Sequence, residues 1–141
     1  MYRVVRVDEP AHRITVVNED GGRELMLDGL VLEAQSAMSD GQTLLWVTDG
    51  SPYEEGLHIY LIARTGEVID VIEAGAPYSP GLLEILSTSE QSVQFRFFRP
   101  EVIYRLEVAP LARLRWFLPN GFRYERTLSR HFLTVVQRVW E

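Results

Sequence analysis

Short runs of apolar residues, most of them β-branched or aromatic, alternate along the chain with groups of turn residues. In each of the first two runs, residues 2–7 and 12–17, apolar side chains recur on one face, and residues 8–11 separate the runs. A period of two is typical of a β-strand that buries one face. The pattern therefore predicts an N-terminal β-hairpin.

The middle of the chain contains an internal repeat. Residues 44–77 and 82–110 each read as two apolar runs, a turn and a third run that begins Glu-Val-Ile, and each ends on Ala-Pro. Apolar runs separated by turn residues in this way are typical of an antiparallel meander. We predict strands at residues 43–48, 57–63 and 67–73 in the first copy, and at residues 82–87, 92–98 and 101–108 in the second.

The alternation continues beyond the repeat, in residues 112–118, where it predicts that Leu114 and Trp116 face inward and that the arginines between them face outward. Residues 119–121 follow and read Pro-Asn-Gly. Asn-Gly tolerates the left-handed conformations that tight hairpin turns require. We predict a hairpin that joins this run to residues 122–126.

Residues 128–140 fit two patterns. The pairs Phe132-Leu133 and Val135-Val136 break a period of two and place the apolar residues on one face of a helix. The valines and threonine of the same segment favour a strand. We predict a C-terminal helix that packs on the sheet.

Composition and length complete the predicted architecture. The chain has 141 residues, of which 46% are hydrophobic and 24% are charged, which is an ordinary globular composition. This length suits one domain. We predict a single, mainly β domain over residues 1–141, in which antiparallel meanders form a sandwich or a barrel and a helix lies at the C-terminus.

Charge is distributed unevenly along the chain. Residues 1–110 contain eight arginines and eighteen acids, a net charge of −10, whereas residues 111–141 contain six arginines and two acids, a net charge of +4. An acidic body repels phosphate, so we rank nucleic-acid binding below protein binding. The arginines of the basic C-terminal part, which are interleaved with aromatic residues, suit single-stranded nucleic acid, an acidic protein or a partner subunit.

The segment by which the first repeat copy exceeds the second is the loop at residues 49–58. Such an insertion is not needed for the sheet, and loops on rigid scaffolds often carry binding groups. Exposed tyrosine beside acidic residues favours contact with another protein. The predicted binding residues are Asp49, Ser51, Tyr53, Glu54, Glu55 and His58 of this loop, together with Tyr78 of a later turn.

Two other functions fit the same residues less well. Asp49, Ser51 and His58 contain the residue types of a hydrolytic triad, but no Gly-x-Ser-x-Gly motif is present. The oxygens of the loop suit a metal ion, yet their spacing matches no calcium-binding loop. A β-barrel with an apolar mouth that binds a small hydrophobic ligand is the other alternative.

We therefore predict a non-enzymatic, bacterial-type binding protein whose acidic face holds a basic protein, as small inhibitors and immunity proteins do by electrostatic steering. No catalytic residue, cofactor or metal is expected. The chain has no cysteine and no apolar run near the roughly 18 residues of a membrane span, so we expect a cytoplasmic protein without a membrane partner. An exposed edge strand also suits homodimerisation.

Overall fold

The computed structural model describes residues 1–50, 56–75, 82–97 and 99–138. Apart from one short 3-10 helix at Ser39–Gly41, the regular elements of these residues are β-strands, and none of their helices is long and apolar enough to cross a membrane. The strands are β1 (Tyr2–Asp8), β2 (Arg13–Asn18), β3 (Leu25–Asp28), β4 (Val31–Ala37), β5 (Thr43–Thr48), β6 (Leu57–Ile62), β7 (Val68–Ala74), β8 (Glu84–Thr88), β9 (Ser92–Arg96), β10 (Ile103–Arg115), β11 (Phe122–Tyr124) and β12 (Ser129–Arg138).

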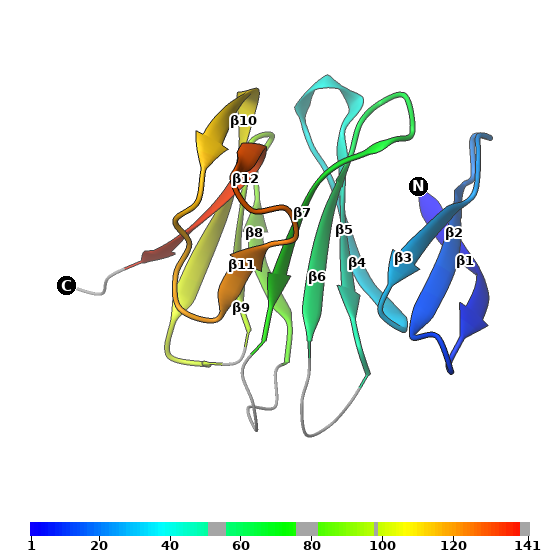
Figure 1. Cartoon of the computed structure of the whole chain (residues 1–141), viewed down its shortest axis with the longest axis horizontal. Helices are drawn as coiled ribbons and strands as arrows, with labels where there is room; N and C mark the ends of the chain where they lie inside the picture. Colours follow the sequence, from blue (N-terminus) through cyan, green and yellow to red (C-terminus); the bar gives the residue numbers. More distant parts are fainter. Residues whose placement is uncertain (51–55, 76–81, 98, 139–141) are drawn as a thin grey trace.

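The strands form three sheets with antiparallel pairing. Their strand orders are β1-β2-β3, β11-β7-β6-β5-β4 and β12-β10-β9-β8. Figure 1 shows the five-stranded sheet in the middle, with the three-stranded sheet on one side and the four-stranded sheet on the other. Among the described residues no sheet closes on itself, so the mainly β, antiparallel prediction is confirmed but the barrel is not.

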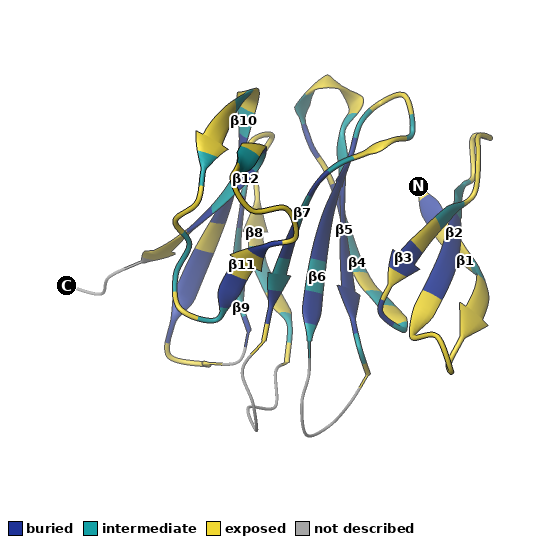
Figure 2. Ribbon diagram, in the orientation of Figure 1, coloured by how far each residue is buried: buried dark blue, intermediate teal, exposed yellow. Residues whose placement is uncertain are grey.

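The middle sheet is buried on both faces. Successive residues of a strand point to opposite sides of the sheet, and in β5 both sides are filled. Leu44 and Trp46 belong to the core shared with the four-stranded sheet, whereas Leu45 and Val47 belong to the core shared with the three-stranded sheet. Figure 2 shows β5 and β6 dark blue along most of their length. An unbroken apolar run in this strand is what burial on two faces requires.

Aromatic packing dominates the core between the five-stranded and four-stranded sheets. The rings of Trp46 and Phe95 meet edge to face with centroids 5.0 Å apart, and Phe122 meets Tyr104 at 4.8 Å. The indole nitrogen of Trp46 donates a hydrogen bond to Ser36 Oγ at 3.0 Å, so the largest buried side chain leaves no polar atom unpaired. Such ring pairs add directional preference to the burial of apolar area.

The small N-terminal sheet packs on the opposite face of the middle sheet. Ile14 and Val16 of β2 share a core with Tyr60 and Ile62 of β6. The Tyr60 hydroxyl also donates a hydrogen bond to the carbonyl oxygen of Asp28, at a distance of 3.0 Å. Apolar packing has little directional preference, whereas this hydrogen bond fixes the end of β3 relative to β6.

The predicted N-terminal hairpin and both meanders are present. Strands β1 and β2 pair directly, β5-β6-β7 form the first meander and β8-β9-β10 form the second. The two meanders lie in different sheets that face each other. That the copies arose by duplication stays a prediction.

The predicted C-terminal helix is wrong. Residues Ser129–Arg138 form β12, which pairs along much of β10, with Leu133 opposite Val108 and Val135 opposite Leu106. The β-branched residues of the segment favour this extended conformation. Leu133 and Val135 point into the core and are buried. Their apolar neighbours Phe132 and Val136 point to the other side of the strand, where Phe132 is partly buried and Val136 is exposed.

The predicted hairpin at Asn120-Gly121 is also wrong, although the turn itself forms. The Phe122 amide donates a hydrogen bond to the Pro119 carbonyl at 3.0 Å, and Gly121 has φ of +91°. The strands around it join different sheets, because β10 pairs with β12 and β11 pairs with β7. Leu114 and Trp116, predicted to face inward, are 57% and 68% exposed.

One buried carboxylate joins the middle sheet to the four-stranded sheet. Oδ1 of Asp70 in β7 accepts hydrogen bonds from His131 Nδ1 at 2.8 Å and from the Val71 amide at 2.9 Å. Oδ2 accepts from the amides of Phe132 and Leu133 in β12, at 2.8 and 2.9 Å. Four donors replace the water that a buried carboxylate loses, so the group stabilises the junction of the two sheets.

We predict that Asp70→Asn lowers the free energy of unfolding by about 2–4 kcal/mol, because the amide group replaces one acceptor oxygen with a donor and leaves buried groups unpaired. Denaturant unfolding followed by circular dichroism measures the change. The exposed Asp20→Asn is the control, with an expected change below about 0.5 kcal/mol. Equal effects of the two substitutions would contradict the structural role of Asp70.

Candidate functional site

The loop that the sequence singles out brings Asp49 and His58 together. Asp49 directly follows β5 and His58 is the second residue of β6, so the antiparallel pairing of these strands places them side by side. The Asp49 amide donates a hydrogen bond to the Gly56 carbonyl at 3.0 Å, which extends the ladder by one step. His58 Nε2 lies 2.9 Å from Asp49 Oδ1.

A second carboxylate lies on the other side of the imidazole. Glu73 of β7 is directly opposite His58 in the register of β6 and β7, and its Oε2 lies 3.3 Å from His58 Nδ1. The side chain of His58 is 13% exposed, whereas those of Asp49 and Glu73 are 31% and 23% exposed. We call Asp49, His58 and Glu73 the acidic cluster. Both ring nitrogens of His58 therefore face a carboxylate.

Two glycines make room for the acidic cluster. A Cβ atom at Gly56 would overlap the Asp49 carboxylate. Gly29 has φ of +115°, and a Cβ atom there would overlap Val47 and lie 3.3 Å from His58 Cδ2. The backbone at Gly56 thus lies against the Asp49 carboxylate, and the backbone at Gly29 lies close to the His58 ring. These close approaches hold the ring and the carboxylate in one relative position.

The surroundings raise the pKa of His58 above its ordinary value of 6.5. Burial alone would lower this pKa, because it disfavours the charged ring. The hydrogen bond from His58 to Asp49 and the negative charges of Asp49, Glu73 and Asp28 outweigh burial. The arrangement thus favours the imidazolium form, which is hydrogen-bonded to Asp49 and forms an ion pair with Glu73.

The structure does not describe the positions of the other predicted site residues. Ser51, Tyr53, Glu54, Glu55 and Tyr78 lie outside the described residues. Glu73, in contrast, is a member that the sequence analysis missed. Its signal is the antiparallel register, since His58 and Glu73 are equally distant from the turn between β6 and β7 once the bulge between Leu61 and Ile62 is allowed for.

No group of three or more histidine or acidic residues within the described ranges has the arrangement of a metal site. In the acidic cluster this agrees with the roles of the atoms. Both nitrogens of His58 face carboxylates, with Nε2 at 2.9 Å from Asp49 and Nδ1 at 3.3 Å from Glu73, so each nitrogen already has a partner.

A second pair of aspartate and histidine lies between the sheets. His131 is 2% exposed, donates from Nδ1 to Asp70 and stacks on Tyr124 with ring centroids 3.8 Å apart. Its Nε2 has no hydrogen-bond partner among the described residues and is shielded from solvent. A general base needs a nitrogen that a substrate can reach. The pair is therefore a structural element, which agrees with the four hydrogen bonds of Asp70.

The sequence analysis did not join Asp70 to His131, which are 61 positions apart. Asp70 shares a face of β7 with the buried Ile72 and Ala74. A charged residue at an inward position of a strand requires a partner, and this was the signal available in the sequence.

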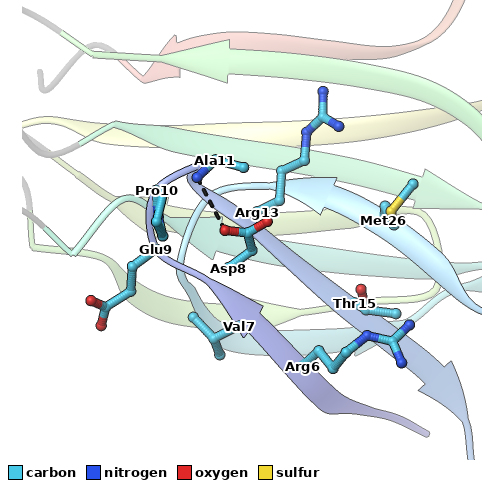
Figure 3. A pocket seen from close by; sticks show the side chains of 9 residues that line it. All are labelled: Arg6, Val7, Asp8, Glu9, Pro10, Ala11, Arg13, Thr15 and Met26. Atoms are coloured by element: carbon cyan, nitrogen blue, oxygen red, sulfur yellow. Dashed lines mark hydrogen bonds between the residues drawn. The ribbon is translucent and has the colours of Figure 1, made fainter.

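A wide depression of about 710 Å³ lies on the outer face of the N-terminal sheet. Figure 3 shows the side chains of Arg6, Arg13 and Met26 around it, together with the turn that follows β1. In that turn Asp8 Oδ1 accepts a hydrogen bond from the Ala11 amide, drawn as a dashed line. Two arginines and two acids in the lining make the depression unsuitable for an apolar ligand.

Comparison with known proteins gives no further assignment. No family model, no curated protein and no solved structure matches the chain.

We predict that an NMR titration places the pKa of His58 above 6.5, and that Asp49→Asn lowers it because the hydrogen bond and one negative charge weaken. A raised pKa in the folded state stabilises the fold fully below pH 6.5, and this contribution is lost as the pH rises through the folded-state pKa. His58→Gln should therefore cost most at low pH. A pKa of His58 at or below 6.5 would contradict the geometry.

Proposed function

We propose that the chain is a non-enzymatic protein-binding module whose acidic face, which contains the acidic cluster, binds a basic protein. The observation that carries the proposal is the pair of carboxylates of Asp49 and Glu73, partly exposed on either side of one histidine. The sequence adds Glu54 and Glu55 to the same loop. Asp49 and Glu73 place negative charge at the end of β5 and near the end of β7, beside His58.

The charge of the whole body supports the same reading. With a net charge of −10, residues 1–110 attract a cationic partner over distances near the Debye length of about 8 Å at physiological salt. Such steering raises the association rate and discriminates against acidic partners. Partly exposed carboxylates at the contact then offer charge-assisted hydrogen bonds to arginine or lysine.

The contacts of His58 argue against the hydrolase alternative. To activate a serine, the histidine must accept the hydroxyl proton on a free ring nitrogen. In the acidic cluster Nε2 is engaged by Asp49 and Nδ1 faces Glu73, so the imidazole balances charge. The ligand-binding barrel receives no support either, because the sheets of the described residues do not close.

A quantitative pull-down from an extract of the source organism tests the proposal. We expect the double variant Asp49→Asn/Glu73→Gln to capture at least about tenfold less partner than the wild type, because two carboxylates of the contact become neutral amides. The matched control is Glu19→Gln/Asp20→Asn, which changes the net charge equally. It lies at the turn after β2, on the opposite side of the view from the end of β5 and the start of β6 (Figure 1).

Capture should also fall steeply as the salt concentration rises, since exposed charges are screened. Equal capture by the two double variants, or capture that is indifferent to salt, would contradict a basic partner on the acidic face. Thermal unfolding of each variant separates loss of binding from loss of the fold.

A further inference from the structure

Exposed apolar side chains gather in the basic C-terminal part of the chain. Trp116, Phe117 and Leu128 are 68%, 84% and 81% exposed, and Leu111 and Leu114 lie on the preceding strand. Single exposed apolar residues are normal on a protein surface, but a group of large ones marks an interaction site.

Three of these residues line one cavity. Trp116, Phe117 and Leu128 surround a space of about 230 Å³, whose lining also includes the buried Phe122 and Tyr124. Arg123 completes the lining and is 76% exposed. We call this cavity the anchor pocket. Sites for drug-sized ligands have about 300–1,000 Å³, so the anchor pocket is suited to a single side chain.

The topology explains why these side chains stay uncovered. After Arg115 the chain leaves the four-stranded sheet, and at Phe122 it joins β7 in the middle sheet. The residues between these points connect the edges of two sheets. No strand of the described residues pairs with them, and Trp116 and Phe117 therefore face solvent.

Buried contacts hold the inner side of the anchor pocket. The hydroxyl of Tyr124 donates a hydrogen bond to the Leu133 carbonyl at 2.7 Å, and the rings of Phe122 and Tyr104 are in contact. The Phe122 amide is bonded to Pro119 across the turn. A pocket formed in this way requires little ordering when a partner binds, which favours affinity.

Charge indicates the chemistry of the occupant. Residues 111–141 have a net charge of +4 along the sequence. Arg123 is the charged residue of the pocket lining, and its Nε lies 3.5 Å from Glu73 Oε1 in an ion pair whose arginine is largely exposed, which is weak enough for a carboxylate of a ligand to replace. Two copies that met through this surface would bring like charges together, which disfavours a symmetric dimer. An occupant with carboxylates is complementary, because the planar guanidinium binds a carboxylate through two parallel hydrogen bonds.

We propose that the anchor pocket is a docking site for an acidic protein segment that inserts one aliphatic or aromatic side chain. The inserted side chain fills the space between Trp116, Phe117 and Leu128, and a flanking carboxylate pairs with Arg123. This site prefers the opposite charge to the acidic face. The two sites adjoin through the ion pair of Arg123 and Glu73, so substitutions outside that pair separate the two proposals: Phe117→Ala for the anchor pocket and Asp49→Asn for the acidic face.

Selection from a displayed library of random 12-residue peptides tests the inference. The wild-type chain is the target, and Trp116→Ala/Phe117→Ala is used to remove peptides that bind elsewhere. Both substituted residues are largely exposed, so the double variant should fold like the wild type. We expect the surviving peptides to share an aliphatic or aromatic residue flanked by aspartate or glutamate.

The best peptide, synthesised with a fluorophore, then gives dissociation constants by anisotropy. Phe117→Ala should weaken binding at least about tenfold, as removal of a central anchor contact does. Arg123→Gln should weaken binding and reduce its dependence on salt. Met26→Ala is the matched control, since Met26 is a large apolar residue of the N-terminal sheet that is 71% exposed, and it should change the affinity less than about twofold.

Three results would overturn the inference. The first is that no peptide survives the subtraction, or that the surviving peptides carry no excess of acidic residues. The second is self-association in analytical ultracentrifugation that Phe117→Ala abolishes, which would identify a second copy as the occupant. The third is Phe117-dependent binding to phosphatidylserine vesicles without peptide binding, which would identify a lipid surface.

Discussion

Among the described residues, the carboxylate of Asp70 makes three hydrogen bonds between the two larger sheets, and the arrangement of these sheets depends on them more than on the single bond from the Tyr124 hydroxyl to the Leu133 carbonyl. Apolar packing between the faces of two sheets is strong but permits sliding, because it has little directional preference. Asp70 in β7 accepts from two consecutive amides and a histidine of β12, and these bonds are satisfied at one relative position of the strands. A buried carboxylate without these donors would be costly, so the sheets are held in that position.

Both proposed surfaces derive their place from β7. Glu73 of β7 is opposite His58 of β6 on one edge of the strand. On the other edge, β11 pairs with β7 and places Arg123 opposite Glu73. Arg123 Nε lies 3.5 Å from Glu73 Oε1, so an ion pair connects the acidic cluster to the anchor pocket. An exposed pair of this kind contributes little to stability. The ion pair shows that two surfaces of opposite charge adjoin on the same sheet.

Much of the fold could be predicted from the sequence, because most strands are short apolar runs between turn residues. The errors have identifiable causes. Periodicity does not show which strand pairs with which, so the turn at Gly121 was assigned to a hairpin although β11 pairs with β7. The uniform apolar run at residues 44–47 indicates burial on two faces, as β5 shows for a strand that lies between two cores. In the candidate site, the short loop was enough to place Asp49 near His58, whereas Glu73 required the register of a third strand.

Native-state hydrogen exchange at the amides of Phe132 and Leu133 is the most direct test of the central claim, that Asp70 joins the two sheets. The account predicts that both amides exchange only on near-global unfolding, because each donates to a buried carboxylate. Exchange of these two amides as fast as that of the exposed turn at residues 19–22 would contradict the claim that Asp70 joins the two sheets. It would also contradict the placement of the acidic cluster beside the anchor pocket.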